Sequence, residues 1–155
     1  MGSEMCIRDR TDGHPASYLF KAWLLAMAGH IAGLILIGSY ISEEPEPNNA
    51  PGGVVIVFFF LVIWPLIITG LLAGTLSVAK TITPTYWHAA LLGAFAVSIL
   101  LGTVFGFGFF IAYIWPTFIG AIAFLAWQMH TNTHAWTMTV ALNAGVNILL
   151  TVFLL

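Results

Sequence analysis

Residues 58–65 read FFFLVIWP and residues 109–116 read FFIAYIWP, so the pattern F-F-x-x-x-I-W-P occurs twice, 51 positions apart. Tryptophan and proline are scarce, with 6 and 7 in 155 residues, so apolar composition alone does not explain a match built on both. Self-similarity at a fixed spacing indicates a repeated structural unit. We therefore interpret the rest of the chain around this repeat.

Each copy is followed by a polar connection and a second apolar segment that opens on tryptophan, Trp87 in the first unit and Trp136 in the second. Both segments reach the pattern V-x-I-L-L ten residues later, at 97–101 and 146–150. The sequence therefore predicts two tandem hairpins, each made of two helices.

The composition indicates a membrane protein. The chain is 60% hydrophobic and 6% charged, with a mean hydropathy of +0.99, whereas soluble domains average about 25% charged residues. Between Val54 and Leu155 the one formally charged residue is Lys80. A membrane-spanning helix needs about 20 apolar residues, so this length accommodates about five. The expected partner is the lipid bilayer, and the net charge of −2 argues against a nucleic-acid partner.

We expect an all-α integral membrane protein, a five-helix transmembrane bundle with one leader helix plus two tandem two-helix hairpin repeats. Residues 18–155 form its single transmembrane domain. The helices are predicted at about 18–41, 54–79, 86–105, 109–129 and 135–155, separated by segments rich in Gly, Pro, Thr and His.

Residues 1–17 are polar and expected to be disordered. Residues 2–10 resemble a translated sequencing-adapter peptide, so we predict a non-native tail. With five spans, Lys21 and Lys80 fall on one side and the loop Glu43–Glu46 on the other. The positive-inside rule then predicts a multi-pass cell-membrane protein with a cytoplasmic N-terminus and the acidic loop outside.

Small residues recur at four-residue spacing, and the pair Gly29 and Gly33 lies on the unduplicated first helix. Small faces let membrane helices approach closely. Such a face packs either against another helix of the same chain or against a second protein, as a homo-oligomer or a membrane complex.

Five polar residues are candidates for a ligand or solute path within the spans: His30, Ser98, Thr103, Asn143 and Asn147. Polar groups inside a membrane are costly, and they either line a functional pathway or hydrogen-bond between helices. The sequence leaves both interpretations open.

The dipeptides Trp64-Pro65 and Trp115-Pro116 are candidate hinges. Proline inside a helix removes one backbone hydrogen bond and bends the helix, and neighbouring groups in a membrane satisfy the freed carbonyl. The two sites either act as a pair of hinges, as in kinked transporter helices, or simply pack beside the bends.

Three histidines, His88, His130 and His134, are weak candidates for a metal site on the cytoplasmic side. No Cys or acidic residue lies near them in the sequence, and we favour their interpretation as ordinary interfacial side chains. We therefore expect no metal and no cofactor.

Residues 118–150 resemble the closing helices of the CAAX-type intramembrane proteases. The likeness lies in a helix–turn–Trp–helix rhythm and in Leu142-Asn143 followed by Asn147. The paired glutamates and catalytic histidine of that family are absent at the matching positions, so the resemblance assigns no catalytic residue here.

Three classes of function remain. The scarcity of ionisable groups within the spans favours a small, non-enzymatic membrane component or subunit. A small-solute transporter or channel that uses the duplicated kinked helices is the first alternative. A membrane enzyme, degenerate and similar to the CAAX-type proteases, is the second.

Overall fold

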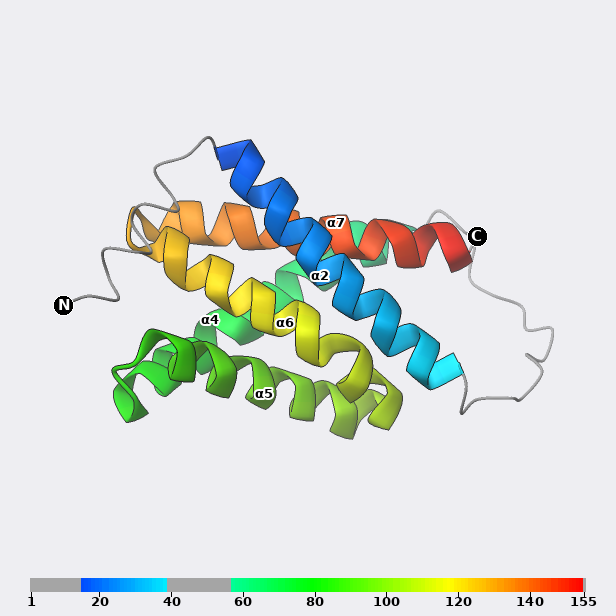
Figure 1. Ribbon diagram of the computed structural model, residues 1–155, viewed down its shortest axis with the longest axis horizontal. Coiled ribbons are helices and arrows are strands. Elements are labelled where there is room, and N and C mark those ends of the chain that lie inside the picture. The colour runs from blue at the N-terminus through cyan, green and yellow to red at the C-terminus, as the bar shows by residue number, and fades with distance from the viewer. Residues whose placement is uncertain (1–14, 39–56, 155) are drawn as a thin grey trace.

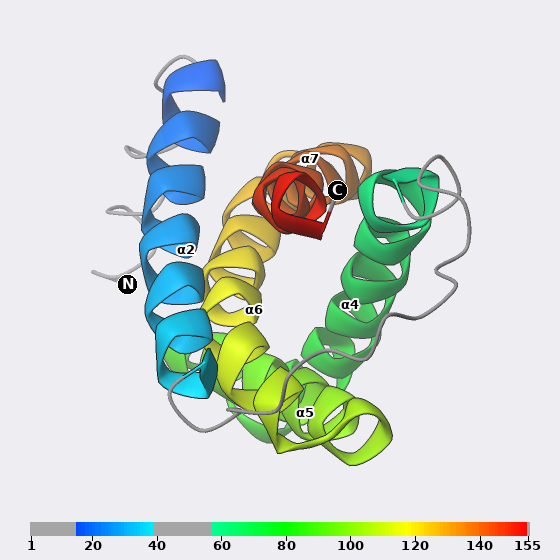
Figure 2. The same ribbon diagram turned by 90° about the vertical axis from the view of Figure 1, so that its right-hand side faces the viewer.

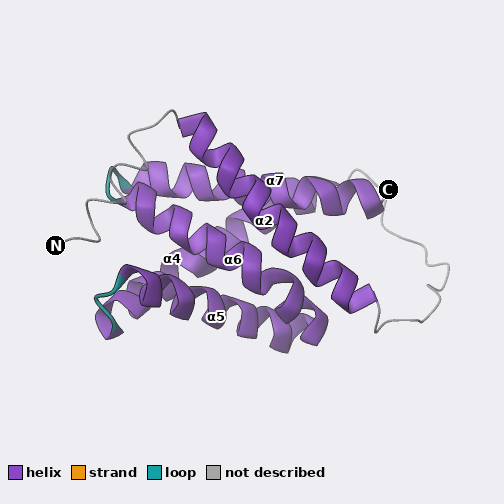
Figure 3. Cartoon of the chain, viewed as in Figure 1, coloured by secondary structure: helices purple, strands orange, loops and turns teal. Residues whose placement is uncertain are grey.

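The computed structural model describes residues 15–38 and 57–154, and these parts of the chain are helical with short connections (Figures 1 and 3). The elements in chain order are α2 (Pro15–Gly38), η1 (Phe59–Ile63), α4 (Trp64–Ile82), α5 (Tyr86–Phe105), α6 (Phe107–Gln128) and α7 (Asn132–Leu154). Because η1 runs directly into α4, the described residues form five helical rods, as the sequence predicts.

Proline and glycine end two of the helices. Pro84 follows α4, and Thr83 adopts the extended conformation that a residue before proline prefers. Gly106 alone separates α5 from α6, and its φ of 99° lies in the left-handed region that favours glycine. The predicted turn at 106–108 is therefore shorter than expected, because α6 already begins at Phe107.

The connection before α7 is also shorter than predicted. The helix begins at Asn132 rather than near residue 135. Thr131 caps it, because its hydroxyl accepts a hydrogen bond from the His134 amide at 3.1 Å. This cap brings part of the predicted polar connection into the first turn of the helix.

The central element is α6, which packs against α2, α5 and α7 and also contacts α4 (Figure 2). Figure 1 shows α2, α5 and α7 running in one direction and α4 and α6 in the other. The two Trp-Pro motifs thus lie on helices that run the same way. Whether the two hairpins are a structural repeat remains a prediction.

Four helices are long and apolar enough to cross a membrane among the residues described: Pro15–Ile37, Phe59–Ile82, Tyr86–Phe105 and Phe107–Gln128. Large apolar side chains such as Ile35 on α2 and Leu91 on α5 are exposed, as expected for contact with lipid. The chain therefore has the features of a multi-pass membrane protein.

The fifth predicted span corresponds to α7, whose side chains are described only as far as Ile148, so whether this helix crosses the membrane remains a prediction. Three polar side chains of this helix, Thr139, Asn143 and Asn147, are buried within the bundle. The predicted tail and the loop Glu43–Glu46 lie outside the described residues, so the orientation of the chain remains a prediction.

Candidate functional site: a buried polar network at two prolines

The first component of the site surrounds Pro116, which lies inside α6. Because proline has no amide hydrogen, the carbonyl of Ala112, four residues earlier, lacks its usual partner. The ring of His30 on α2 fills this role, with Nδ1 at 2.9 Å from the Ala112 oxygen. His30 is completely buried. A side chain 82 residues away thus satisfies the backbone group that the proline leaves open.

The second component surrounds Pro65. The preceding residues form a π-helix, η1, in which the amide of Trp64 donates to the carbonyl of Phe59, five residues back. The carbonyl of Phe60 therefore receives no hydrogen bond from the amide of residue 64, its α-helical partner. It receives none from residue 65, its π-helical partner, because proline has no amide hydrogen. Asn147 on α7 donates its Nδ2 hydrogen to this carbonyl at 3.1 Å.

The Tyr113 side chain joins the two components. Its hydroxyl accepts a hydrogen bond from Trp64 Nε1 at 2.8 Å and donates to Asn147 Oδ1 at 3.4 Å. Its ring meets the His30 ring edge to face, with centroids 5.6 Å apart and planes at 72°. The buried side chain of Tyr113 therefore links α2, α4, α6 and α7.

The sequence-based list of site residues missed Tyr113. The available signal is its position: the residue lies in the middle of a predicted span, inside the FFIAYIWP motif, whereas tyrosine in membrane proteins concentrates at the interfaces.

Two further pairs of buried polar side chains connect helices. Asn143 Nδ2 donates to Thr69 Oγ1 at 3.1 Å, joining α7 to α4. Thr117 Oγ1 donates to the Tyr113 carbonyl at 2.6 Å, so the Ser98 hydroxyl, 3.0 Å away, is the donor to Thr117. These contacts match the interpretation of the polar residues as hydrogen-bonding groups between helices.

Four of the five residues predicted for a polar path are buried: His30, Ser98, Asn143 and Asn147. They occur in separate groups, three of which reach Tyr113: His30 contacts its ring, Asn147 its hydroxyl, and Ser98 its carbonyl by way of Thr117. Thr103, the fifth candidate, is not buried. Its side chain is exposed and donates at 2.8 Å to the Leu100 carbonyl of its own helix. Threonine satisfies its hydroxyl locally in this way without a partner helix.

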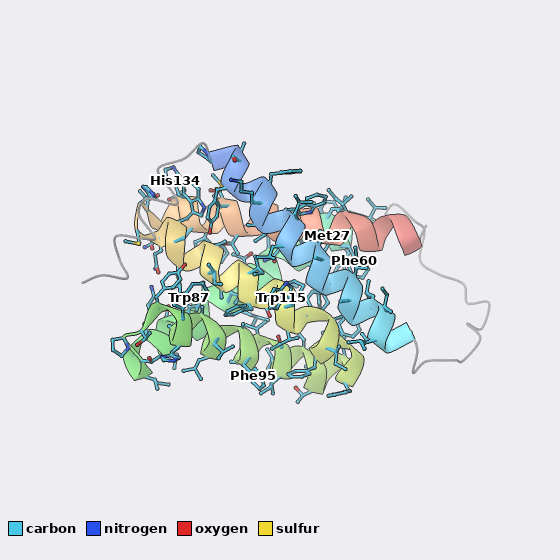
Figure 4. The ribbon with its side chains drawn as sticks, in the orientation of Figure 1. Met27, Phe60, Trp87, Phe95, Trp115 and His134 are labelled. Carbon is cyan, nitrogen blue, oxygen red and sulfur yellow. The ribbon has the colours of Figure 1, made fainter. Side chains whose placement is uncertain are left out.

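The two Trp-Pro sites have different surroundings despite their similar sequences. Trp64 is buried, with 4% of its surface exposed, whereas Trp115 is 39% exposed. Trp115 lies where α6 meets α2 and donates from Nε1 to the Leu25 carbonyl at 2.9 Å (Figure 4). Hinge motion at these sites remains a prediction, and their environments are not equivalent.

The face of α2 that carries Gly29 and Gly33 packs against another helix of the same chain. A methyl group on Gly29 would overlap the indole of Trp115, and one on Gly33 would lie 3.1 Å from the Ile111 carbonyl oxygen and 3.2 Å from Ala112 Cα. These glycines let α2 approach the backbone of α6 closely. The suggested oligomer through Gly29 and Gly33 is therefore not supported, because α6 already occupies that face.

The three candidate metal ligands do not form a metal site. His88, His130 and His134 are exposed, and the last of these lies at one end of the bundle (Figure 4). The rings of His130 and His134 both pack against Trp127, with centroid distances of 5.4 and 6.4 Å. Over residues 15–38 and 57–154, no group of three His, Cys, Asp or Glu side chains could hold a metal ion.

No protein-family model, curated protein or solved structure matches the chain.

Proposed function

We propose that the chain is a non-enzymatic membrane component whose buried polar residues hold its own helices together. The observation that carries this proposal is the pairing at the two prolines. The carbonyl opened at Pro116 is bonded by His30, and the one opened at Pro65 is bonded by Asn147. Polar side chains used in this way stabilise a fold and leave few groups free for a solute.

The proposal predicts a protein without transport activity. The purified chain is reconstituted into liposomes that contain a pH-sensitive dye, and fluxes of protons, potassium and glycerol are compared with those of empty liposomes. We expect equal rates. A saturable flux that disappears in the variant Asn147→Leu would overturn the proposal, because the same polar residues would then be moving a solute.

A small-solute transporter or channel is the second candidate. Four buried side-chain polar atoms have no hydrogen-bond partner in the described part of the chain: Trp23 Nε1, His30 Nε2, Trp127 Nε1 and Thr139 Oγ1. Unpaired groups in lipid are costly and favour a ligand or water beside them. The liposome experiment distinguishes this candidate from the first.

We do not propose a protease-like enzyme. The described residues contain no Asp or Glu, so they provide no carboxylate pair for the chemistry that the resemblance would imply.

A further inference from the structure

The contact between His30 and Ala112 fixes the protonation pattern of the imidazole ring. A carbonyl oxygen can only accept a hydrogen bond, so Nδ1 must carry the hydrogen. In the neutral ring Nε2 is then a bare acceptor. This atom is buried and has no partner in the described part of the molecule.

Among the described residues, His30 has no anionic partner for a second proton. From α6, the titratable group that contacts the ring is the Tyr113 phenol. From α7, the other helix packed on α2, the one titratable side chain is His134, which lies against Trp127 at the end of the bundle. The formally charged residues among those described are Lys21 and Lys80, so no carboxylate is present there to pair with an imidazolium.

A proton on Nε2 would create two unfavourable features together. It would place a positive charge in the membrane interior, and it would add an N–H donor that faces no acceptor. His30 contacts α6 through the Ala112 carbonyl and the Tyr113 ring, and its remaining nitrogen has no acceptor among the described residues. Separation of α2 from α6 would admit water to the ring.

The interface between α2 and α6 is where such a change would occur. Gly29 and Gly33 let the two helices approach closely, and Ala26 and Met27 of α2 pack with Ile119 and Ala123 of α6 beside them. Hydrogen bonds from His30 to Ala112 and from Trp115 to Leu25 cross this interface. The first of these depends on the same imidazole that would take up the proton.

We propose that His30 is a proton-operated latch, which holds α2 against α6 when neutral and releases α2 when protonated at Nε2.

The latch is tested by measuring the distance between the two helices. Ile35 on α2 and Phe107 on α6 are 68% and 72% exposed, so both can be replaced with spin-labelled cysteine after Cys6 is changed to serine. Distances are recorded in lipid nanodiscs at about pH 8 and about pH 5, on either side of the usual histidine pKa. We expect a second, longer-distance population at the lower pH.

Two variants show which histidine is responsible. His30→Asn places an amide hydrogen near the position of Nδ1 but cannot take up a proton, so its distance distribution should be the same at both pH values. His134→Asn removes an exposed histidine and should retain the response. The proposal is overturned if the parent protein shows no pH-dependent change, or if His30→Asn responds as fully as the parent.

A measurement without a histidine variant covers the case in which His30→Asn does not fold. In protein labelled with nitrogen-15 at histidine, NMR should show His30 with its hydrogen on Nδ1 at about pH 8. Nε2 should gain a proton over the pH range in which the distance changes. A neutral ring with its hydrogen on Nε2, or protonation without a change in distance, would show that the latch does not exist.

Discussion

The pairing of His30 with Pro116 can be tested by restoring the missing backbone amide. In the variant Pro116→Ala, the amide of residue 116 can donate to the Ala112 carbonyl in the regular helical pattern. The carbonyl then no longer needs His30. We therefore expect His30→Leu to destabilise the protein strongly when residue 116 is proline, and weakly when it is alanine.

The expected loss of stability follows from the buried hydrogen bond, 2.9 Å long, between His30 Nδ1 and the Ala112 carbonyl oxygen. Hydrogen bonds between membrane helices contribute about 0.6 kcal/mol on average and at most about 1.7 kcal/mol. A buried carbonyl left without a partner costs about 1–3 kcal/mol. We expect a cost of about 1–3 kcal/mol for His30→Leu in the parent and about 1 kcal/mol less in Pro116→Ala. The loss of the unpartnered Nε2 is common to both backgrounds and cancels.

The assay is reversible unfolding by sodium dodecyl sulfate in mixed micelles, followed by circular dichroism, for the parent, both single variants and the double variant. Pro84→Ala provides a matched control, because Pro84 lies between α4 and α5 and opens no helical carbonyl near His30. His30→Leu should be additive with Pro84→Ala. If the free-energy changes of His30→Leu and Pro116→Ala also add to that of the double variant within about 0.5 kcal/mol, the proposed role of His30 is wrong.

Two more comparisons use the same unfolding assay. Asn147→Leu should cost about 1–3 kcal/mol because it leaves the Phe60 carbonyl unpaired, whereas Thr103→Val, at an exposed residue, should change stability by less than about 0.5 kcal/mol. Equal effects would contradict the assignment of Asn147. Gly29→Ala should destabilise by about 1–3 kcal/mol, because its methyl group would overlap a tryptophan ring of α6. At Gly74 the space is open, so Gly74→Ala should stabilise by about 0.5–1 kcal/mol, and destabilisation there would refute this interpretation of the glycines.

The helices of this chain could be predicted from the sequence because local features determine them. Apolar length predicted the rods, and Pro84 and Gly106 end two of them by restricting or permitting particular backbone conformations. The start of α7, near His134, was predicted less accurately, because the Thr131 hydroxyl caps this helix earlier than the polar composition suggested.

The details of the site could not be predicted because they depend on which helices are neighbours. The burial of His30 and Asn147 was expected from their positions within the spans. Their hydrogen bonds to backbone carbonyls of other helices, and the contact that each makes with Tyr113, could not be predicted. The π-helical turn at η1 could not be predicted from the sequence either. In a regular α-helix, Pro65 would leave the carbonyl of Leu61 without a partner, but the π-helical turn leaves the carbonyl of Phe60 open instead.

The hydrogen bonds at the two prolines also show what α2 contributes to the fold. Neither opened carbonyl is satisfied from within its own hairpin. The first motif receives Asn147 from α7, the last helix of the second unit, and the second receives His30 from α2, which lies outside the predicted repeat. A protein made of the two hairpins alone would retain the first contact and leave the Ala112 carbonyl open in lipid. The leader helix therefore completes the second hairpin, and the chemistry of His30 determines whether that contact persists.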